Sequence, residues 1–273
     1  MLQLRCGAPA LERYLTQGRR RIDGWLDYTS GRMISHLSLR QMELGIRGSL
    51  GEIGVHHGLL FIVLALSSGP DERLFAVDVF GRQDLNIDKS GKGSRTWFDL
   101  NTRTAGIDPA HIHVMETSSL DITGQDILEA VGPVRLMSID AGHTPECVVN
   151  DIQLAEVALA HEGVAILDDV FNVTWPGVIS GLATYWMSDP QLVPFAASPN
   201  KVFACRSRHV PHYRRMFTSL FSKHLDRSDR LFGFPIDTYG TWHPMGEKPR
   251  GLSTVQRHIN RLREKYPRWF SYM

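Results

Sequence analysis

The sequence contains a glycine-rich segment, Gly48-Ser-Leu-Gly-Glu-Ile-Gly-Val-His-His-Gly58, which runs directly into the apolar segment Leu59-Leu-Phe-Ile-Val-Leu-Ala-Leu66. We interpret the two as a short buried strand, a sharp turn and a helix that is apolar nearly all round. Such a turn leaves backbone N–H groups free at the start of the helix, and glycine lets a ligand approach them closely. The spacing of Gly51, Gly54 and Gly58 differs from G-x-G-x-x-G, which is typical of dinucleotide sites. Alone, the segment fits a nucleotide-like cofactor site or a structural turn.

Strand and helix patterns alternate along the rest of the chain. After the first strand we predict strands at 73–78, 111–115, 134–140, 163–169, 192–197 and 202–206. We predict helices at 9–45, 121–131, 144–163, 175–186 and 252–266. This alternation predicts an α/β fold, a doubly wound parallel sheet with helices on both faces. The last two strands are so close together that they must form an antiparallel hairpin.

Composition narrows the class of protein. The chain has 273 residues and a formal net charge of +1, so it offers no broad basic surface for nucleic acid or an anionic membrane. Its three cysteines are widely separated, which indicates neither a disulfide framework nor a zinc cluster. Met1-Leu-Gln-Leu-Arg5 does not resemble a signal peptide, and no apolar run is long enough to span a bilayer. We therefore expect a cytoplasmic protein that binds neither nucleic acid nor membrane.

Acidic residues end several of the predicted strands, where ligands bind in an open parallel sheet. Asp78 follows the glycine turn by about one strand and helix, which suits hydrogen bonds to ribose hydroxyls, although a capping role also fits. Asp140, Asp168 and Asp169 would repel one another in one cleft unless a cation such as Mg²⁺, Mn²⁺ or Ca²⁺ joined them. Capping and hydrogen bonding around the cleft are the alternative. Asp168 and Asp169 can both face a metal only if the strand ends there.

Histidines and a polar segment accompany these acids. His143 follows Asp140 by three residues and is a candidate general base, or else a surface or capping residue. His56 and His57 lie in the glycine turn, where we expect them to form the helix start and the pocket wall. The polar segment 81–93 is long for a connection in such a fold, and such loops are often functional. The helical segment 9–45 covers the core, or it acts as a lid.

Five motifs in order resemble those of class I S-adenosylmethionine-dependent methyltransferases, and more narrowly the macrocin-type group of sugar and natural-product O-methyltransferases. They are Gly51-Glu-Ile-Gly-Val-His-His-Gly58; Ala76-Val-Asp-Val-Phe80 with Gln83, Asn86, Ser90 and Gly91; Ser138-Ile-Asp-Ala-Gly-His143; Ile166-Leu-Asp-Asp169; and Trp175-Pro-Gly-Val178. The resemblance covers residues 22–206. It implies a Rossmann-like sheet of seven strands, mostly parallel with the last strand antiparallel.

The resemblance also implies roles for single residues. Glu52 and Gly54 would line the methionine and ribose part of S-adenosylmethionine, and Asp78 would hold the ribose. The remaining cofactor residues would be His57, Gly58, Ser118, Ser119 and Asp140. In metal-dependent relatives, acids matching Asp140, Asp168 and Asp169 bind Mg²⁺. Catechol-type enzymes have Asp-Asn where this chain has Asp168-Asp169, so the match is nearer the macrocin type. Asp140 or His143 would take the proton of the acceptor hydroxyl.

These expectations combine into one functional hypothesis. We expect an N-terminal helical cap at 1–45, a cofactor-binding core at 46–210 and a C-terminal extension packed on the core at 211–273. The enzyme would transfer a methyl group to a hydroxyl of a small-molecule acceptor, with help from a divalent cation. Apolar N-terminal helices make a homo-oligomer possible. The alternatives are an NAD-dependent oxidoreductase of the same architecture and a binding module without catalysis.

Overall fold

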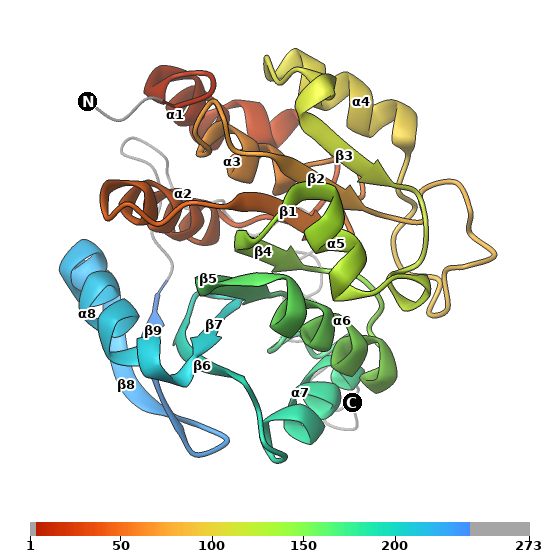
Figure 1. Ribbon diagram of the computed structural model, residues 1–273. Helices are drawn as coiled ribbons and strands as arrows, with labels where there is room; N and C mark the ends of the chain where they lie inside the picture. The colour runs from red at the N-terminus through yellow and green to blue at the C-terminus, as the bar shows by residue number, and fades with distance from the viewer. Residues whose placement is uncertain (1–3, 241–273) are drawn as a thin grey trace, which may run out of the picture. The chain divides into compact units, whose positions relative to one another are not determined.

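The computed structural model describes residues 4–240, and the predicted helix at 252–266 lies outside them. Nine strands form one sheet in the order β3-β2-β1-β4-β5-β7-β6-β9-β8 (Figure 1). They are β1 (Ser49–Ile53), β2 (Leu74–Val77), β3 (Ile112–Met115), β4 (Val134–Ile139), β5 (Leu159–Leu167), β6 (Leu192–Ala197), β7 (Val202–Arg206), β8 (Leu225–Leu231) and β9 (Phe234–Tyr239).

The first five strands are parallel to one another, as predicted. β7 is antiparallel to both β5 and β6, which confirms the predicted hairpin. The chain builds outward from β1 to β3 and then crosses back to β4, so the order reverses between β1 and β4. Ligands of open α/β sheets bind beyond the carboxyl ends of the strands at such a reversal.

The expected count of seven strands is wrong, because β8 and β9 extend the sheet beyond β6. Their turn is Phe232-Gly233, and both residues have positive φ, of 48° and 87°. Two such residues make the tight turn that suits a two-residue hairpin. β8 reads Leu225-Asp-Arg-Ser-Asp-Arg-Leu231 and is almost wholly exposed. It therefore lacks the apolar pattern by which the other strands are recognised.

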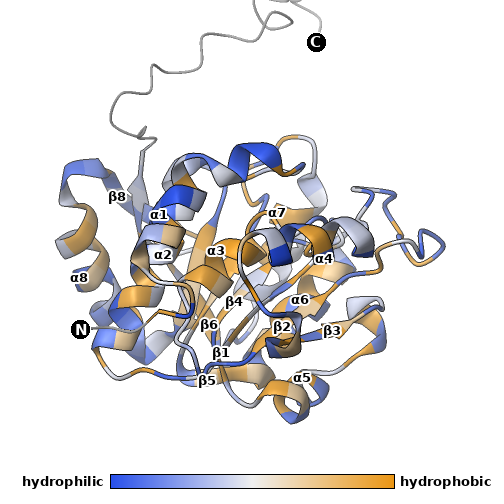
Figure 2. Ribbon diagram, turned by 90° about the horizontal axis from the view of Figure 1, so that it is seen from above, coloured by the Kyte–Doolittle hydropathy of each residue, from blue (hydrophilic) through white to orange (hydrophobic). Residues whose placement is uncertain are grey.

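Residues 4–240 contain eight α-helices. They are α1 (Ala8–Thr16), α2 (Tyr28–Glu43), α3 (Phe61–Leu66), α4 (Arg95–Thr104), α5 (Gly124–Val131), α6 (Pro145–Ala158), α7 (Pro176–Trp186) and α8 (Val210–Phe221). Apolar residues of α5, α6 and α7 form one core cluster with alternate residues of the parallel strands. In Figure 2 orange apolar strands lie near the centre, and the helices around them carry both orange and blue residues.

Two of the predicted helices differ from the structure. The segment 9–45 forms α1 and α2 with the short 3-10 helix η1 (Gly18–Arg21) after α1, so it is not continuous. α6 ends at Ala158, where we expected Gly163 to end it, because β5 already begins at Leu159. In the part of the chain that the structure describes, no helix has the length and apolar content needed to cross a membrane.

Candidate active site

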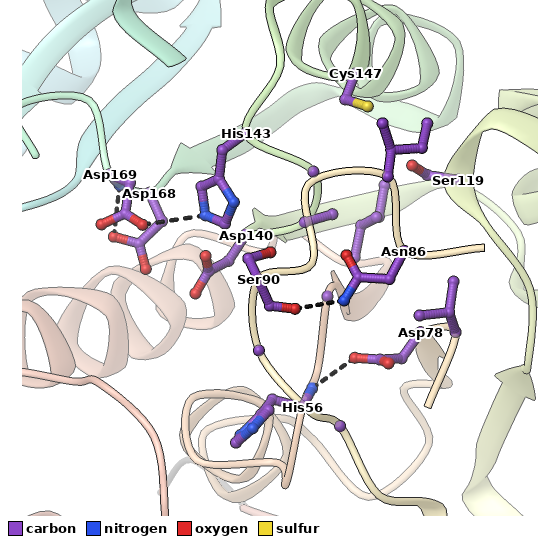
Figure 3. Close-up of a pocket in the computed structure, with 18 of the residues that line it drawn as sticks. His56, Asp78, Asn86, Ser90, Ser119, Asp140, His143, Cys147, Asp168 and Asp169 are labelled. Carbon is purple, nitrogen blue, oxygen red and sulfur yellow. Dashed lines mark hydrogen bonds and ion pairs between the residues drawn. The ribbon is translucent and has the colours of Figure 1, made fainter. Parts of the chain in front are cut away.

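A cavity of about 440 Å³ opens at the carboxyl ends of the parallel strands. Its wall comes from the turns after β1, β2, β4 and β5, the segment 81–93 and the 3-10 turn η3 (Ser119–Asp121). Figure 3 shows side chains from all of these segments converging on it. The sheet thus brings the predicted strand-end acids to one place.

Gly54 is the point of closest approach in the glycine turn. Its φ is +85°, and a Cβ at this position would overlap the carbonyl oxygen of Asp140. The Gly54 N–H donates to the Val77 carbonyl at 2.8 Å, and the Asp140 N–H donates to the Ile53 carbonyl at 2.8 Å. Only glycine fits here without strain, and the turn lies tightly between the ends of β2 and β4.

Asp78 lies directly after β2 and faces the cavity. Its carboxylate accepts the His56 N–H at 2.7 Å and the Phe80 N–H at 2.6 Å (Figure 3). Burial raises its pKa, and these two hydrogen bonds act in the opposite sense. The carboxylate is thereby fixed against the glycine turn, and each oxygen retains a lone pair for a ligand.

The other predicted cofactor residues divide into two groups. Ser118 and Ser119 line the cavity. Glu52, His57 and Gly58 do not. Glu52 is only 2% exposed and accepts a hydrogen bond from the Ser138 hydroxyl at 3.2 Å.

The surroundings of these three residues explain their placement. Burial raises the pKa of Glu52 to about 8. His57 faces Asp23, with 3.9 Å between Nδ1 and Oδ2. The backbone of Gly58 lies against Phe98, where a Cβ would come within 3.1 Å of the ring. The turn therefore presents Gly54 and His56 to the cavity, with Glu52 beneath it.

Asp140, Asp168 and Asp169 all line the cavity. Asp169 has a φ of 57°, so the extended backbone of β5 has ended before it. Asp168 forms an ion pair with the ammonium of Lys201, which is itself almost wholly buried. Asn200 donates to Oδ1 of Asp168 at 2.9 Å and to Oδ1 of Asp169 at 2.7 Å. The two adjacent acids are thus turned toward one region, which a regular strand would not allow.

Two of the three acids, Asp140 and Asp169, have perturbed pKa values. Burial raises the pKa of Asp140 well above its usual value, and Asp168 raises it further. Burial also acts to raise the pKa of Asp169, but hydrogen bonds from His143, Asn172 and Asn200 outweigh it and lower the value to about 2. Two close carboxyl groups either share a proton or bind a cation between them. The pKa of Asp140 and the pKa of Asp169 therefore shift in opposite directions.

His143 lies between two carboxylates. Its Nδ1 is 2.7 Å from Oδ2 of Asp88, and its Nε2 is 3.2 Å from Oδ2 of Asp169. Its backbone N–H also donates to Asp88, at 2.6 Å. Its ring stacks on Trp175 with 4.2 Å between the ring centres. Burial acts to lower the pKa of His143, but the hydrogen bonds with Asp169 and Asp88 raise it overall.

Three residues of the site escaped the sequence analysis. Asp88 belongs to the polar segment 81–93, which was noted as a long and often functional loop, but Asp88 itself was not singled out. Asn200 and Lys201 belong to the turn between β6 and β7, which was noted only as a hairpin. Because β7 runs antiparallel to β5, its first residues lie beside the last residues of β5. That pairing is the signal that could have found Lys201.

Oxygen donors dominate the part of the cavity around Asp140. Ligand atoms of Asp140, His143 and Asp169 lie within 4.8 Å of one another, and Asp168 adjoins them. Carboxylate oxygens suit Mg²⁺, Mn²⁺ and Ca²⁺, and such an ion would stabilise the charged form of Asp140, whose pKa burial raises. Asp140 and Asp169 offer such oxygens beside His143, whereas Asp168 is paired with Lys201.

Solved structures with a similar fold include O-methyltransferases. NovP aligns with a TM-score of 0.54 and 16% identity, over 66% of this chain and 81% of NovP. An O-methyltransferase from Bacillus cereus in complex with SAH aligns with a TM-score of 0.52 and 17% identity, over 74% and 92%. TomG from Streptomyces achromogenes, in complex with SAM, aligns with a TM-score of 0.51 and 16% identity, over 73% and 90%. At these identities the likeness shows the fold.

The sequence itself gives the more specific match. Comparison with curated proteins finds nothing similar. Residues 52–170, from the end of β1 to just beyond β5, match a family described as a methyltransferase domain. This match confirms the predicted resemblance to class I S-adenosylmethionine-dependent methyltransferases, and with it the prediction that the chain is an enzyme of this kind.

Proposed function

We propose that the enzyme transfers a methyl group from S-adenosylmethionine to a hydroxyl of a small-molecule acceptor, with a divalent cation bound by the acids of the cavity. The observation that carries this proposal is that a nucleotide-type half and an acid–base half share one cavity. Gly54 and Asp78 belong to the first, and Asp140, His143 and Asp169 belong to the second.

The cofactor half suits an adenosine. Asp78 would accept hydrogen bonds from the ribose hydroxyls, in the position that acids after a second strand take in nucleotide-binding sheets. Ser118 and Ser119 would lie toward the adenine, and Gly54 would admit the ribose and methionine part close to the backbone. S-adenosylmethionine supplies an activated methyl group, so the protein has mainly to align two partners and remove a proton.

The acid half would hold the cation. Asp140, Asp168 and Asp169 are the proposed ligands, and the cation would lower the pKa of an acceptor hydroxyl nearby. Lys201 already balances one carboxylate charge at Asp168. A divalent ion would therefore have to balance chiefly the charges of Asp140 and Asp169.

His143 is the stronger candidate for the residue that receives the hydroxyl proton. The Asp88 carboxylate accepts a hydrogen bond from the backbone N–H of His143 and lies at hydrogen-bond distance from Nδ1 of the His143 ring. A proton held on Nδ1 by Asp88 would leave Nε2 to take the proton of the acceptor, once the cation engages the Asp169 carboxylate that now lies 3.2 Å from Nε2. Asp140 is the alternative, but as a proposed ligand its carboxylate oxygens would be engaged by the cation and less free to receive the proton.

The rim of the cavity suits an acceptor with an apolar body. Trp25 and Ile87 line the cavity and are 78% and 58% exposed. Trp175 lines it beside His143. A sugar or natural product with an apolar or aromatic portion would cover these side chains while it presents a hydroxyl to His143. This agrees with the macrocin-type resemblance of the sequence.

Calorimetry with S-adenosylhomocysteine, the product form of the cofactor, tests the proposal. We expect the whole chain to bind it, and Asp78→Asn to weaken binding by roughly 10–150-fold, because one charge-assisted hydrogen bond contributes roughly 1.5–3 kcal/mol. Asp84→Asn is the matched control, since Asp84 lies in the segment 81–93 and is exposed. Failure of the wild type to bind this compound, together with binding of NAD, would reject the methyl-transfer proposal.

A further inference from the structure

Two histidines and a glutamate meet near the amino-terminal end of β5, at the end of the sheet opposite the cavity. His161 and Glu162 lie near the beginning of β5, and His209 ends the 3-10 turn η4 (Ser207–His209) after β7. Nε2 of His209 is 3.0 Å from Nδ1 of His161. The same Nδ1 is 3.4 Å from Oε1 of Glu162. One donor atom from each residue lies within 4.8 Å of the other two.

A bulge in β5 brings the first two residues together. Val134 of β4 pairs with Leu159, and Leu136 then pairs with Val164, so residues 160–163 of β5 face a single residue of β4. Adjacent residues on a regular strand point to opposite faces. The bulge removes this constraint from His161 and Glu162, and bulges commonly redirect side chains in this way.

The bulge is fixed by side chains from the segment that also carries His209. Arg206 donates to the Ala160 carbonyl at 2.8 Å, and the Tyr213 hydroxyl donates to the Glu162 carbonyl. His209 lies between Arg206 and Tyr213 in the sequence. The same short segment therefore holds the bulge in place and supplies the third donor, which preorganises the three side chains.

We propose that His161, Glu162 and His209 form a binding site for a divalent transition-metal ion such as Zn²⁺. Two imidazole nitrogens and one carboxylate oxygen are a donor set that Zn²⁺ takes in proteins. Bonds of about 2.0–2.2 Å to a tetrahedral ion place neighbouring donors roughly 3.3–3.5 Å apart, close to the two spacings of the cluster.

The state of the histidines and their exposure also fit an ion. The contact between the two ring nitrogens requires one of them to lack a proton, so a lone pair is already present. His161 and Glu162 have half-exposed side chains, at 51% and 48%, which leaves room for water as a further ligand. Nitrogen donors select Zn²⁺ over Mg²⁺, so the ion differs from the one proposed for the cavity. The site does not depend on the methyl-transfer proposal.

Titration calorimetry of the chelator-treated whole chain with Zn²⁺ alone tests the site. We expect His161→Ala and His209→Ala each to weaken binding by about tenfold or more, because each removes one of three protein ligands. His113→Ala is the control, since His113 is an exposed histidine on β3, away from the cluster. Electron paramagnetic resonance with Cu²⁺ should show nitrogen couplings that decrease in each cluster variant and persist in the control.

Unchanged Zn²⁺ titrations in both cluster variants would overturn the proposal, because the ion would then be bound elsewhere. An equal loss in His113→Ala would overturn it as well. Circular dichroism checks that each variant is folded. If His209→Ala is not folded, His209→Gln replaces it in the test, because glutamine keeps a hydrogen-bonding side chain. His209→Gln must then show the same loss of Zn²⁺ affinity.

Discussion

The two ends of β5 carry clusters of opposite character. At its carboxyl end, Asp168 and Asp169 lie in a cavity and are surrounded by donors, including the buried ammonium of Lys201. At its amino end, His161 and Glu162 lie on the surface beside His209. The first cluster offers carboxylate oxygens that repel one another strongly. The second offers mainly imidazole nitrogens, which repel one another little.

This difference shows how one strand can support two kinds of chemistry. Buried carboxylates need a cation or a shared proton, so the carboxyl end is suited to hold Mg²⁺ and to direct proton transfer. Exposed imidazoles need neither a cation nor a shared proton. Binding of an ion at the amino end therefore depends on the spacing of the donor atoms. Proton transfer from a hydroxyl is therefore expected at the carboxyl end alone.

The largest expected effect is the loss of the base at the carboxyl end. His143→Gln should lower kcat by about 10²–10⁴-fold, the usual contribution of general base catalysis. Binding of S-adenosylhomocysteine should persist, because Asp78 and Gly54 are unchanged. His209→Gln, at the amino end, is the control and should retain full activity. Equal kcat values for His143→Gln and the wild type would assign the proton to another group.

The cations of the two ends should be separable. Asp169→Asn should weaken the activation of the EDTA-treated enzyme by Mg²⁺ by about tenfold or more, because it removes a charged oxygen ligand. The same variant should leave the Zn²⁺ titration of the His161 cluster unchanged. Activity that persists in EDTA and in Asp169→Asn would remove the cation from the reaction. A shared loss of both ions would show that the two clusters are not independent.

The fold was largely predictable because most of its strands are buried on both faces. β1, β2, β4 and β6 are buried throughout, so each is a short apolar run between turn signals. β8 follows the opposite rule, because it is an exposed edge strand with charged residues, and it was missed. The position where α6 gives way to β5 was also missed, since a bulge in β5 displaces the apolar pattern by several residues.

The site was predictable only where the sequence order follows the sheet. Asp78, Asp140, Asp168 and Asp169 each follow a parallel strand, so their convergence could be expected from topology. Lys201 reaches the same place through an antiparallel strand, and pairing partners of such a strand cannot be identified from its own residues. Asp88 reaches it through an irregular segment, whose path depends on contacts with His143 that no local pattern encodes.

Asp88 therefore gives the most specific test of the carboxyl end. Because the pKa of His143 is raised, its neutral, basic imidazole forms only at pH values above the ordinary pKa of histidine. We therefore expect kcat to rise as the pH increases through the raised pKa. Asp88→Asn removes one of the two carboxylates that hold the protonated ring. The rise in kcat should then occur at lower pH, while the plateau falls by about 10–100-fold because the ring is less firmly oriented.

The matched control for this test is Asp84→Asn, an exposed change in the same segment that should leave the pH profile unaltered. Loss of orientation and loss of charge can be separated within the Asp88→Asn profile. An unmoved profile with a lower plateau would mean that Asp88 positions the ring without setting its basicity. A moved profile with an unchanged plateau would mean the reverse. If neither the pH profile nor the plateau changes, the base lies outside the Asp88–His143 pair. The distinction between the two ends of β5 would then rest on the cation alone.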